Sequence, residues 1–174
     1  MSSSLMKHNI ILTGFMGTGK TSVGKRLADL LHWQYVDVDE TIEKQVAMSI
    51  SEYFKTRGEP SFRDIESSTL YELLSHQQHV ISTGGGAVIR QENRRLMHEN
   101  GFVICLEATP EVIFERIHRE KHRPVLGNTP DLNKIQQVLQ ERIEYYKDSD
   151  WCIDTSQKTV FQVVEEIINH IKRI

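Results

Sequence analysis

The segment at residues 14–21 constrains this chain more than any other feature. Its sequence, GFMGTGKT, matches the pattern G-x-x-x-x-G-K-[ST]. An apolar run at residues 9–13 precedes it and a helical repeat follows it, a setting in which backbone N–H groups and a helix N-terminus hold phosphate groups. Lys20 is placed to reach the β- and γ-phosphates, and the hydroxyl of Thr21 is an oxygen ligand for Mg²⁺. The alternative, a glycine-rich turn that binds no phosphate, is disfavoured by this strand-to-helix context.

The order of the apolar runs predicts the fold class. Five runs bounded by turn signals have the length and composition of strands, at residues 9–13, 34–38, 80–83, 102–106 and 151–154. Helical periodicity separates them, and helices that cross back over a sheet are typical of parallel strands covered on both faces. We therefore predict an α/β fold, a three-layer α/β/α arrangement with a five-stranded parallel sheet, in a single domain that spans residues 1–174.

Two helical repeats accompany the predicted strands. Apolar residues recur at three- or four-residue spacing after the first and after the last predicted strand. These positions are Val23, Leu27, Leu30 and Leu31, and Phe161, Val164, Ile168 and Ile171. The predicted pattern therefore alternates strand with helix.

Charge and apolar composition disfavour two classes of partner. The chain has 21 Lys and Arg against 24 Asp and Glu, a formal charge of −3, so it lacks the basic field that attracts nucleic acid. Its apolar runs are far shorter than the roughly 18 to 20 residues that cross a bilayer, and residues 1–7 lack the apolar stretch of a secretory signal. Cys105 and Cys152 lie in apolar runs, so we expect both to be reduced core residues. We expect a cytoplasmic monomer that binds neither nucleic acid nor membrane.

Two carboxylates close the second predicted strand. One residue separates Asp37 from Asp39, so strand alternation places both side chains on one side. They lie at the carboxyl edge of the sheet, where open α/β folds bind ligands. One carboxylate would serve a metal ion and the other an acceptor molecule. For Asp39, the N-cap of the following helix is an equally good interpretation.

Two arginines need partners. Arg142 continues a helical stripe of apolar residues, and an arginine on a core-facing stripe must be paired. An internal carboxylate such as Asp39 is the favoured partner on the residues alone, and a bound anion is the alternative. Arg63 precedes Glu66 by three residues, which favours a modest surface ion pair.

Two glycine- or proline-containing segments complete the set of candidates. Gly84, Gly85 and Gly86 follow the third predicted strand. Because glycine has no Cβ, their backbone N–H groups can approach a ligand closely, although a flexible turn is the simpler interpretation.

Residues 118–131 are predicted to be a mobile loop. Arg123 in this loop could fold over ATP, or could be an ordinary solvated charge. The scattered histidines predict no zinc site.

Together these residues resemble the shikimate kinase family over nearly the whole chain. The matching motifs are residues 14–21, the DVD sequence at 37–39, Phe62 with Arg63, the glycine triplet at 84–86, Arg123 with Pro124, and Arg142 with Tyr146. The resemblance implies a nucleoside monophosphate kinase type of fold, with an acceptor-binding region at about 39–76 and a lid at about 118–131. It also implies transfer of the γ-phosphoryl group of ATP to the 3-hydroxyl of shikimate, with Mg²⁺, in chorismate and aromatic amino-acid biosynthesis.

The resemblance implies a role for each matching residue. ATP would be bound by Gly14, Met16, Gly17, Thr18, Gly19, Lys20, Thr21, Ser22, Arg116 and Arg123. Shikimate would be bound by Asp39, Arg63, Gly84, Gly85, Gly86 and Arg142, with Glu66 supporting Arg63. Mg²⁺ would be held by Thr21 and, through water, by Asp37. The catalytic residues would be Lys20, Asp39 as the base at the acceptor hydroxyl, and Arg123 as the lid arginine, while Arg116 would stack on adenine.

Three other functions remain open on the sequence alone. A gluconate kinase, or another small-molecule kinase, would share the phosphate-binding loop and the sheet. A regulatory protein could bind ATP or shikimate without turnover. A nucleic-acid-binding protein could use early basic residues such as Lys25 and Arg26, although the acidic balance disfavours it. The chain also departs from the family's pattern at residues 146–159, which affects the assignment of the residues near adenine.

Overall fold

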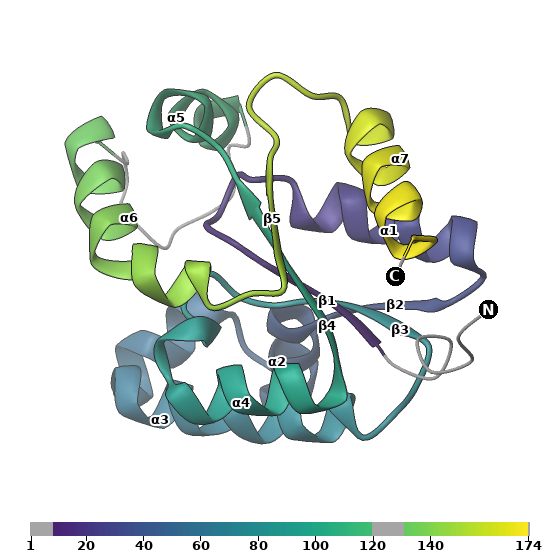
Figure 1. The fold of residues 1–174 in the computed structure, drawn as a ribbon. Helices are drawn as coiled ribbons and strands as arrows, with labels where there is room; N and C mark the ends of the chain where they lie inside the picture. Colours follow the sequence, from purple (N-terminus) through teal and green to yellow (C-terminus); the bar gives the residue numbers. More distant parts are fainter. Residues whose placement is uncertain (1–8, 120–130, 174) are drawn as a thin grey trace.

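A parallel sheet with the strand order β2-β3-β1-β4-β5 forms the centre of the computed structural model (Figure 1). The structure describes residues 9–119 and 131–173. The strands are β1 (Asn9–Thr13), β2 (Gln34–Asp37), β3 (His79–Ser82), β4 (Gly101–Glu107) and β5 (Trp151–Asp154). All four neighbouring pairs are parallel. The predicted α/β fold with a five-stranded parallel sheet is therefore confirmed, and every strand end lies within one residue of the predicted one.

Helices connect the strands and cover both faces of the sheet. They are α1 (Lys20–Leu31), α2 (Val38–Val46), α3 (Ile50–Leu74), α4 (Gln91–Asn100), α5 (Pro110–Arg119), α6 (Leu132–Lys147), α7 (Val160–Ile171) and the short 3-10 helix η2 (Ala87–Ile89). Helix α3 contains a break at Gly58, whose φ of 79° and ψ of 168° are not helical. None of these helices, in the part of the chain that the structure describes, is long and apolar enough to cross a membrane.

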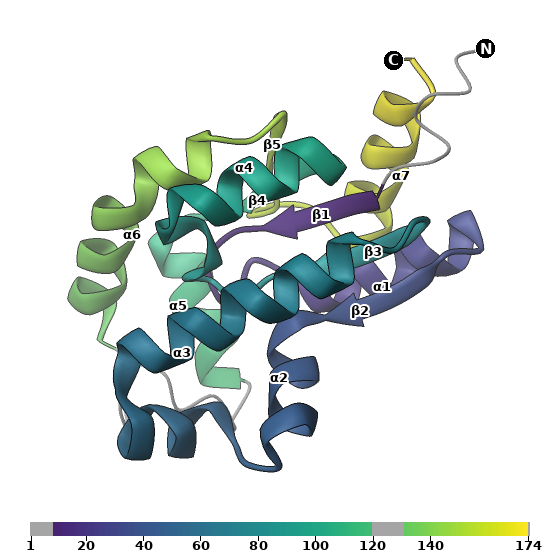
Figure 2. The ribbon, with the colours of Figure 1, turned by 90° about the horizontal axis from the view of Figure 1, so that it is seen from below.

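Strand alternation divides the core into two layers. Ile10 and Val80 face α1 and α7, whereas Ile11 and Ile81 belong to the opposite cluster, which includes residues of α2, α3, α4, α5 and α6. Figures 1 and 2 show α1 with α7 on one side of the sheet and α3 with α4 on the other. Neighbouring residues on a strand therefore serve different layers, as a sheet covered on both faces requires.

One prediction about buried side chains is wrong. Cys152 is exposed, while Cys105 is fully buried. The two cysteines differ because β5 is the outermost strand of the sheet and β4 is an inner one.

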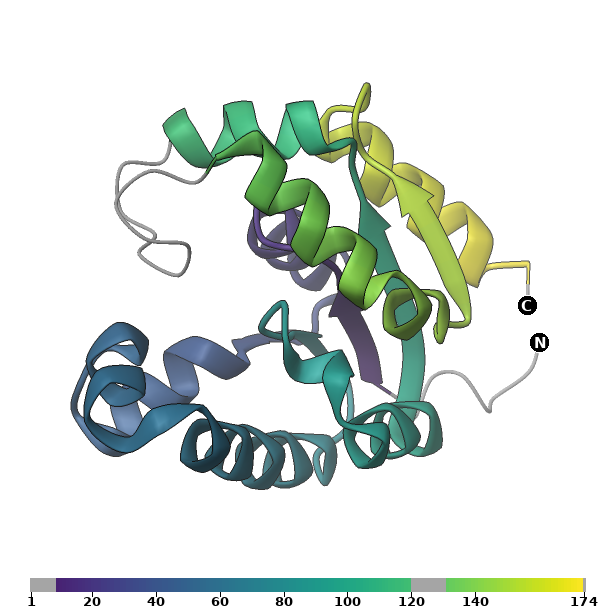
Figure 3. The same cartoon turned by 90° about the vertical axis from the view of Figure 1, so that its left-hand side faces the viewer.

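The carboxyl ends of the strands form the functional edge of the molecule. Because all strands run in the same direction, the segments that follow β1, β2 and β3 meet there. Figure 3 shows α2 and the beginning of α3 (blue) on one side of this edge, and α5 and α6 (green) on the other. The strand order reverses at β1, which has β3 on one side and β4 on the other. Open α/β sheets bind ligands at such a position.

Candidate active site

The loop between β1 and α1 is folded around the side chain of Lys20. The Nζ of Lys20 donates hydrogen bonds to the carbonyl oxygens of Gly14 at 2.7 Å and Phe15 at 2.9 Å. Gly17 and Gly19 have φ values of 77° and 99°, a backbone region that glycine adopts far more readily than other residues. Helix α1 begins at Lys20, so its free N–H groups and positive dipole end face this loop. The loop therefore has the form of a phosphate cradle.

The predicted ATP-binding residues of this loop divide into two groups. Most of them line a cleft at the carboxyl edge of the sheet: Met16, Gly17, Gly19, Lys20, Thr21 and Ser22. Gly14 and Thr18 are buried within the loop. The Oγ1 of Thr18 donates to the carbonyl oxygen of Phe15 at 2.8 Å, so this side chain stabilises the loop conformation.

Asp37 ends β2 and caps the helix that follows. Its Oδ1 accepts a hydrogen bond from the backbone N–H of Glu40 at 3.1 Å, and its Oδ2 accepts one from the hydroxyl of Tyr35 at 3.3 Å. The suggestion that Asp39 is the N-cap is therefore wrong. The chain enters α2 at Val38, so the capping position falls on Asp37, and the two carboxylates are not alternating residues of one strand.

Asp39 is a half-buried residue in the first turn of α2, and its Oδ1 is shielded from solvent. Within the described residues its Oδ1 has no hydrogen-bond partner. Burial raises its pKa to about 7, with further contributions from the charges of Asp37 and Glu66, while Lys20 acts in the opposite direction. A carboxylate with a pKa near neutrality can accept a proton at physiological pH. The structure thus gives Asp39 the properties of a general base.

Arg63 is held by a buried ion pair on α3. One guanidinium nitrogen lies 2.7 Å from Oε2 of Glu66, which is only 1% exposed, and another lies 3.2 Å from Oε1 of Glu59, which is 59% exposed. The interpretation of Arg63 and Glu66 as a surface pair is therefore wrong. Burial raises the pKa of Glu66, although the positive charge of Arg63 opposes this. Arg90 extends the arrangement by donating to the backbone carbonyl of Arg63 at 3.0 Å.

The glycine triplet packs against these charged side chains. A Cβ at Gly84 would lie 2.7 Å from Oδ1 of Asp39, and a Cβ at Gly86 would collide with the guanidinium of Arg63. The hydroxyl of Tyr146 donates to the carbonyl oxygen of Gly85 at 2.6 Å. The triplet is therefore a tightly packed support, which excludes its interpretation as a loose turn.

Arg142 lies on α6, one helical turn before Tyr146, and lines the same cleft. Its positive charge lowers the pKa of Tyr146 and of Glu66, against the larger effect of burial in both. Among the described residues the predicted ion pair of Arg142 with Asp39 is not formed, and Oδ1 of Asp39 has no hydrogen-bond partner there. Arg142 thus places a positive charge in the lining of the cleft, which Arg63 also lines.

Arg116 connects the phosphate-binding loop to the segment after β5. It donates to the carbonyl oxygen of Gly17 at 3.2 Å, and to the hydroxyl and carbonyl oxygens of Thr155 at 3.0 Å and 2.8 Å. The hydroxyl of Thr155 also lies 3.0 Å from the carbonyl oxygen of Thr18. These contacts place Arg116 at the nucleotide side of the site, and its stacking on adenine stays a prediction.

A single cleft of about 460 Å³ joins the two halves of the site. Lys20 and Thr21 line it on the phosphate side, and Asp39, Arg63 and Arg142 line it on the acceptor side. Sequence reasoning missed Phe54 and Thr83, which also line the cleft, and it missed Arg90. No spacing or motif distinguishes these three residues from ordinary core or surface positions.

Part of the predicted site lies outside the described residues. Arg123, His122 and most of the predicted lid at 118–131 belong to the segment 120–130, which the structure does not describe. The described flanks are helical, since α5 continues to Arg119 and the side chain of Asp131 caps α6.

Comparison with known proteins agrees with this geometry. The family model described as shikimate kinase matches residues 16–172. A shikimate kinase from Thermodesulfovibrio yellowstonii is 45% identical over 166 residues, which cover 95% of this chain and 96% of that protein. This chain belongs to the shikimate kinase family. It is an ATP-dependent small-molecule kinase, from a family that acts in aromatic amino-acid biosynthesis.

Solved structures of shikimate kinases have the same fold. The structure of shikimate kinase from Acinetobacter baumannii in complex with shikimate superimposes with a TM-score of 0.91 at 34% identity, and the match covers 97% of this chain and 95% of that one. A gluconokinase from Sinorhizobium meliloti superimposes with a TM-score of 0.65 at 18% identity. At that identity the second likeness shows the shared fold alone, so it lends no weight to a gluconate kinase activity.

Proposed function

We propose that this shikimate kinase family member transfers the γ-phosphoryl group of ATP to the 3-hydroxyl of shikimate, giving shikimate 3-phosphate. One observation carries the proposal: the phosphate-binding loop, a carboxylate with a pKa near 7 and two arginines line one cleft. Shikimate has a carboxylate and three ring hydroxyls, which complement such a surface. The A. baumannii relative solved in complex with shikimate supports this choice of acceptor.

Arg63 and Arg142 would bind the carboxylate of shikimate. An arginine binds a carboxylate through two parallel hydrogen bonds, which fixes orientation as well as adding affinity. Arg63 is already oriented by Glu66 at 2.7 Å, and the backbone of Gly84, Gly85 and Gly86 would lie against the ring. With the acceptor anchored at its carboxylate, its hydroxyl would be positioned beside Asp39.

Asp39 would accept the proton of the attacking hydroxyl. Phosphoryl transfer depends more on positioning and on charge neutralisation than on a strong base, so a carboxylate with a pKa of about 7 is sufficient. Lys20 would neutralise charge on the β- and γ-phosphates. Arg123 would act from the lid at 118–131, as the family resemblance implies, and Arg116 would hold the nucleotide side.

The donor set near the phosphate-binding loop fits Mg²⁺. The hydroxyl of Thr21 and the carboxylate of Asp37 line the cleft beside Lys20, and Mg²⁺ prefers oxygen ligands and keeps several waters. The carboxylate of Asp37 retains acceptor capacity beyond its cap to Glu40. When bound, the ion would neutralise charge on the phosphate oxygens of ATP.

The remaining assignments follow from the same interpretation. The acceptor-binding region at about 39–76 would comprise α2 and α3, and residues 1–174 would form one domain. An ATP-dependent activity and two free cysteines support a cytoplasmic location, where thiols stay reduced.

Release of ADP tests the proposed reaction. The purified protein is incubated with ATP, Mg²⁺ and one acceptor: shikimate, quinate, gluconate or a nucleoside monophosphate. We expect turnover with shikimate that is lost in Asp39→Asn. Turnover with another acceptor alone would discard the substrate assignment, and binding without turnover would favour a regulatory protein.

Two arginine variants test the division of roles. Arg142→Ala should mainly weaken shikimate binding, whereas Arg123→Ala should mainly lower kcat. Equal shikimate affinity in the wild type and Arg142→Ala would remove Arg142 from the acceptor site. A normal kcat in Arg123→Ala, with loss of acceptor affinity alone, would remove Arg123 from catalysis.

A further inference from the structure

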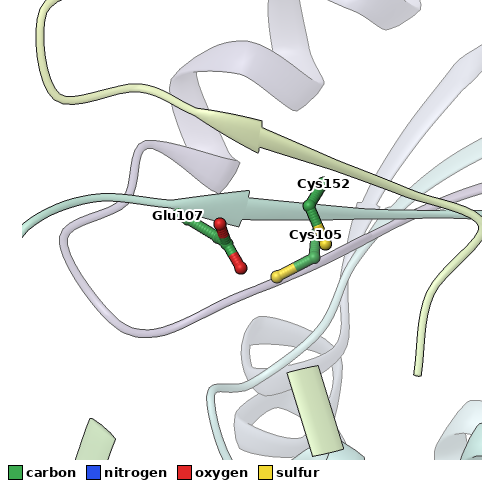
Figure 4. A group of neighbouring side chains, drawn as sticks. All are labelled: Cys105, Glu107 and Cys152. Atoms are coloured by element: carbon green, nitrogen blue, oxygen red, sulfur yellow. The ribbon is translucent and has the colours of Figure 1, made fainter. Parts of the chain in front are cut away.

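Three potential metal ligands gather on the sheet outside the proposed kinase site. Cys105 and Glu107 belong to β4 and Cys152 belongs to β5, and one ligand atom of each lies within 4.8 Å of the other two. Figure 4 shows the carboxylate of Glu107 and the two sulfurs turned toward one another. We propose that these three side chains form a binding site for a thiophilic divalent cation such as Zn²⁺ or Cd²⁺.

The sheet itself positions the three ligands. Cys105 and Cys152 are directly paired in the parallel register of β4 and β5, so their side chains leave the sheet on the same face. Glu107 follows Cys105 by two residues on one strand and therefore shares that face. Asp154 is the register partner of Glu107, but its Oδ1 already accepts hydrogen bonds from the N–H and the hydroxyl of Ser156 at 2.9 Å and 2.6 Å. Because the pairing of β4 with β5 already positions these ligands, metal binding does not have to order a loop.

Thr13 borders the buried ligand of the cluster. It is paired in register with Cys105, and both residues are buried. A hydroxyl at this position can donate a hydrogen bond to a metal-bound thiolate. Because the metal displaces a proton, its affinity should increase with pH.

The ligand types select the class of metal. Two thiolates and one carboxylate suit Zn²⁺ and softer cations such as Cd²⁺, whereas Mg²⁺ requires oxygen ligands such as those of Thr21 and Asp37. Cys152 and Glu107 are exposed, so the site opens to solvent and leaves a coordination position for water. Ser149, whose Oγ is 3.2 Å from the sulfur of Cys152, borders this open side.

Cadmium titration of the full chain tests the site. The reduced protein is titrated with Cd²⁺ in oxygen-free buffer, and the ultraviolet charge-transfer band of cadmium thiolate is recorded. We expect the band to saturate at one cation per chain, to strengthen with increasing pH and to be displaced by Zn²⁺. Absence of the band at saturating Cd²⁺ would overturn the proposal.

Variants of exposed residues separate this site from adventitious binding. Cys152→Ser should lose most of the band and Glu107→Gln should bind about tenfold more weakly or worse, since even outer-shell partners of a metal ligand are worth that much. Glu111→Gln, an acidic residue of the first turn of α5 outside the cluster, is the matched control and should bind as the wild type does. Equal binding by Cys152→Ser and the wild type would place the cation elsewhere, for example on the eight histidines, and would overturn the assignment. Cys152 is exposed, so Cys152→Ser should fold, which circular dichroism checks.

Discussion

The carboxylate of Asp39 lies directly against the backbone of Gly84, so that a Cβ at residue 84 would be 2.7 Å from its Oδ1. The two residues come from α2 and from the segment after β3, and they meet because parallel strands bring their carboxyl ends to one edge. The contact leaves no room for a side chain at residue 84. The position of the proposed base therefore depends on a glycine 45 residues away in the sequence.

We predict that Gly84→Ala lowers turnover by moving Asp39. A methyl group at 2.7 Å forces the carboxylate or the backbone to shift, and a displacement of about 1 Å at a reacting group costs roughly a hundredfold in rate. Steady-state kinetics with shikimate measures the loss. An unchanged kcat in Gly84→Ala would contradict the proposed dependence of Asp39 on Gly84.

The raised pKa of Asp39 predicts a pH-dependent stability. The folded protein holds a proton on Asp39 up to a pH of about 7, whereas the unfolded chain loses it near 3.8. The stability that this proton contributes is complete below the lower value and is lost as the pH rises toward the upper one, by up to about 1.4 kcal/mol per pH unit. Denaturant unfolding of the ligand-free wild type and of Asp39→Asn over this range measures the difference. A difference independent of pH would show that Asp39 is not protonated in the folded protein.

The same proton should appear in the kinetics. The proposed base must be ionised to accept the hydroxyl proton, so kcat/KM for shikimate should decrease as the pH falls below about 7. The pH dependence of kcat/KM reports groups of the free enzyme. A profile that stays flat down to the ordinary pKa of an aspartate would contradict this role.

We predict that Glu66→Gln weakens shikimate binding through Arg63. The hydrogen bond between them joins two charged groups at 2.7 Å, and Glu66 is 1% exposed. A charged hydrogen bond is worth about 1.5 to 3 kcal/mol, so KM for shikimate should increase about tenfold or more, with a smaller change in kcat. Glu59→Gln is the control, because Glu59 contacts the same guanidinium but is 59% exposed and should contribute little. A larger effect from Glu59→Gln would reverse the assignment.

Tyr146→Phe should loosen the glycine triplet. The variant removes the hydroxyl that donates to Gly85 at 2.6 Å and leaves a carbonyl oxygen without this donor, at a cost of about 1 kcal/mol. Denaturant unfolding should show this loss, and KM for shikimate should increase. Tyr145→Phe, a change at the neighbouring and less buried tyrosine, should alter neither quantity. If Tyr146→Phe keeps both the stability and the KM of the wild type, the hydroxyl does not support the triplet.

The sequence by itself determined the features that depend on local order along the chain. Alternation of apolar runs with helical repeats predicted a parallel α/β sheet, because strand and helix periodicities are properties of neighbouring residues. The pattern at residues 14–21 identified the phosphate-binding loop, since its glycines and Lys20 act within one short segment. Family resemblance then named the acceptor and the candidate residues.

Only the tertiary structure decided which side chains share an environment. The N-cap at Asp37 rather than Asp39, the buried ion pair of Arg63 with Glu66 and the exposure of Cys152 were each misjudged from the sequence. Burial depends on the elements that cover a residue, and the pKa of Asp39 depends on charges and neighbours from α1, α2 and α3. The pairing of Cys105 with Cys152 likewise exists only because β4 and β5 are neighbours in the sheet. Burial and strand pairing depend on elements that are distant in the sequence and leave no periodic signal there, so the structure was needed to find them.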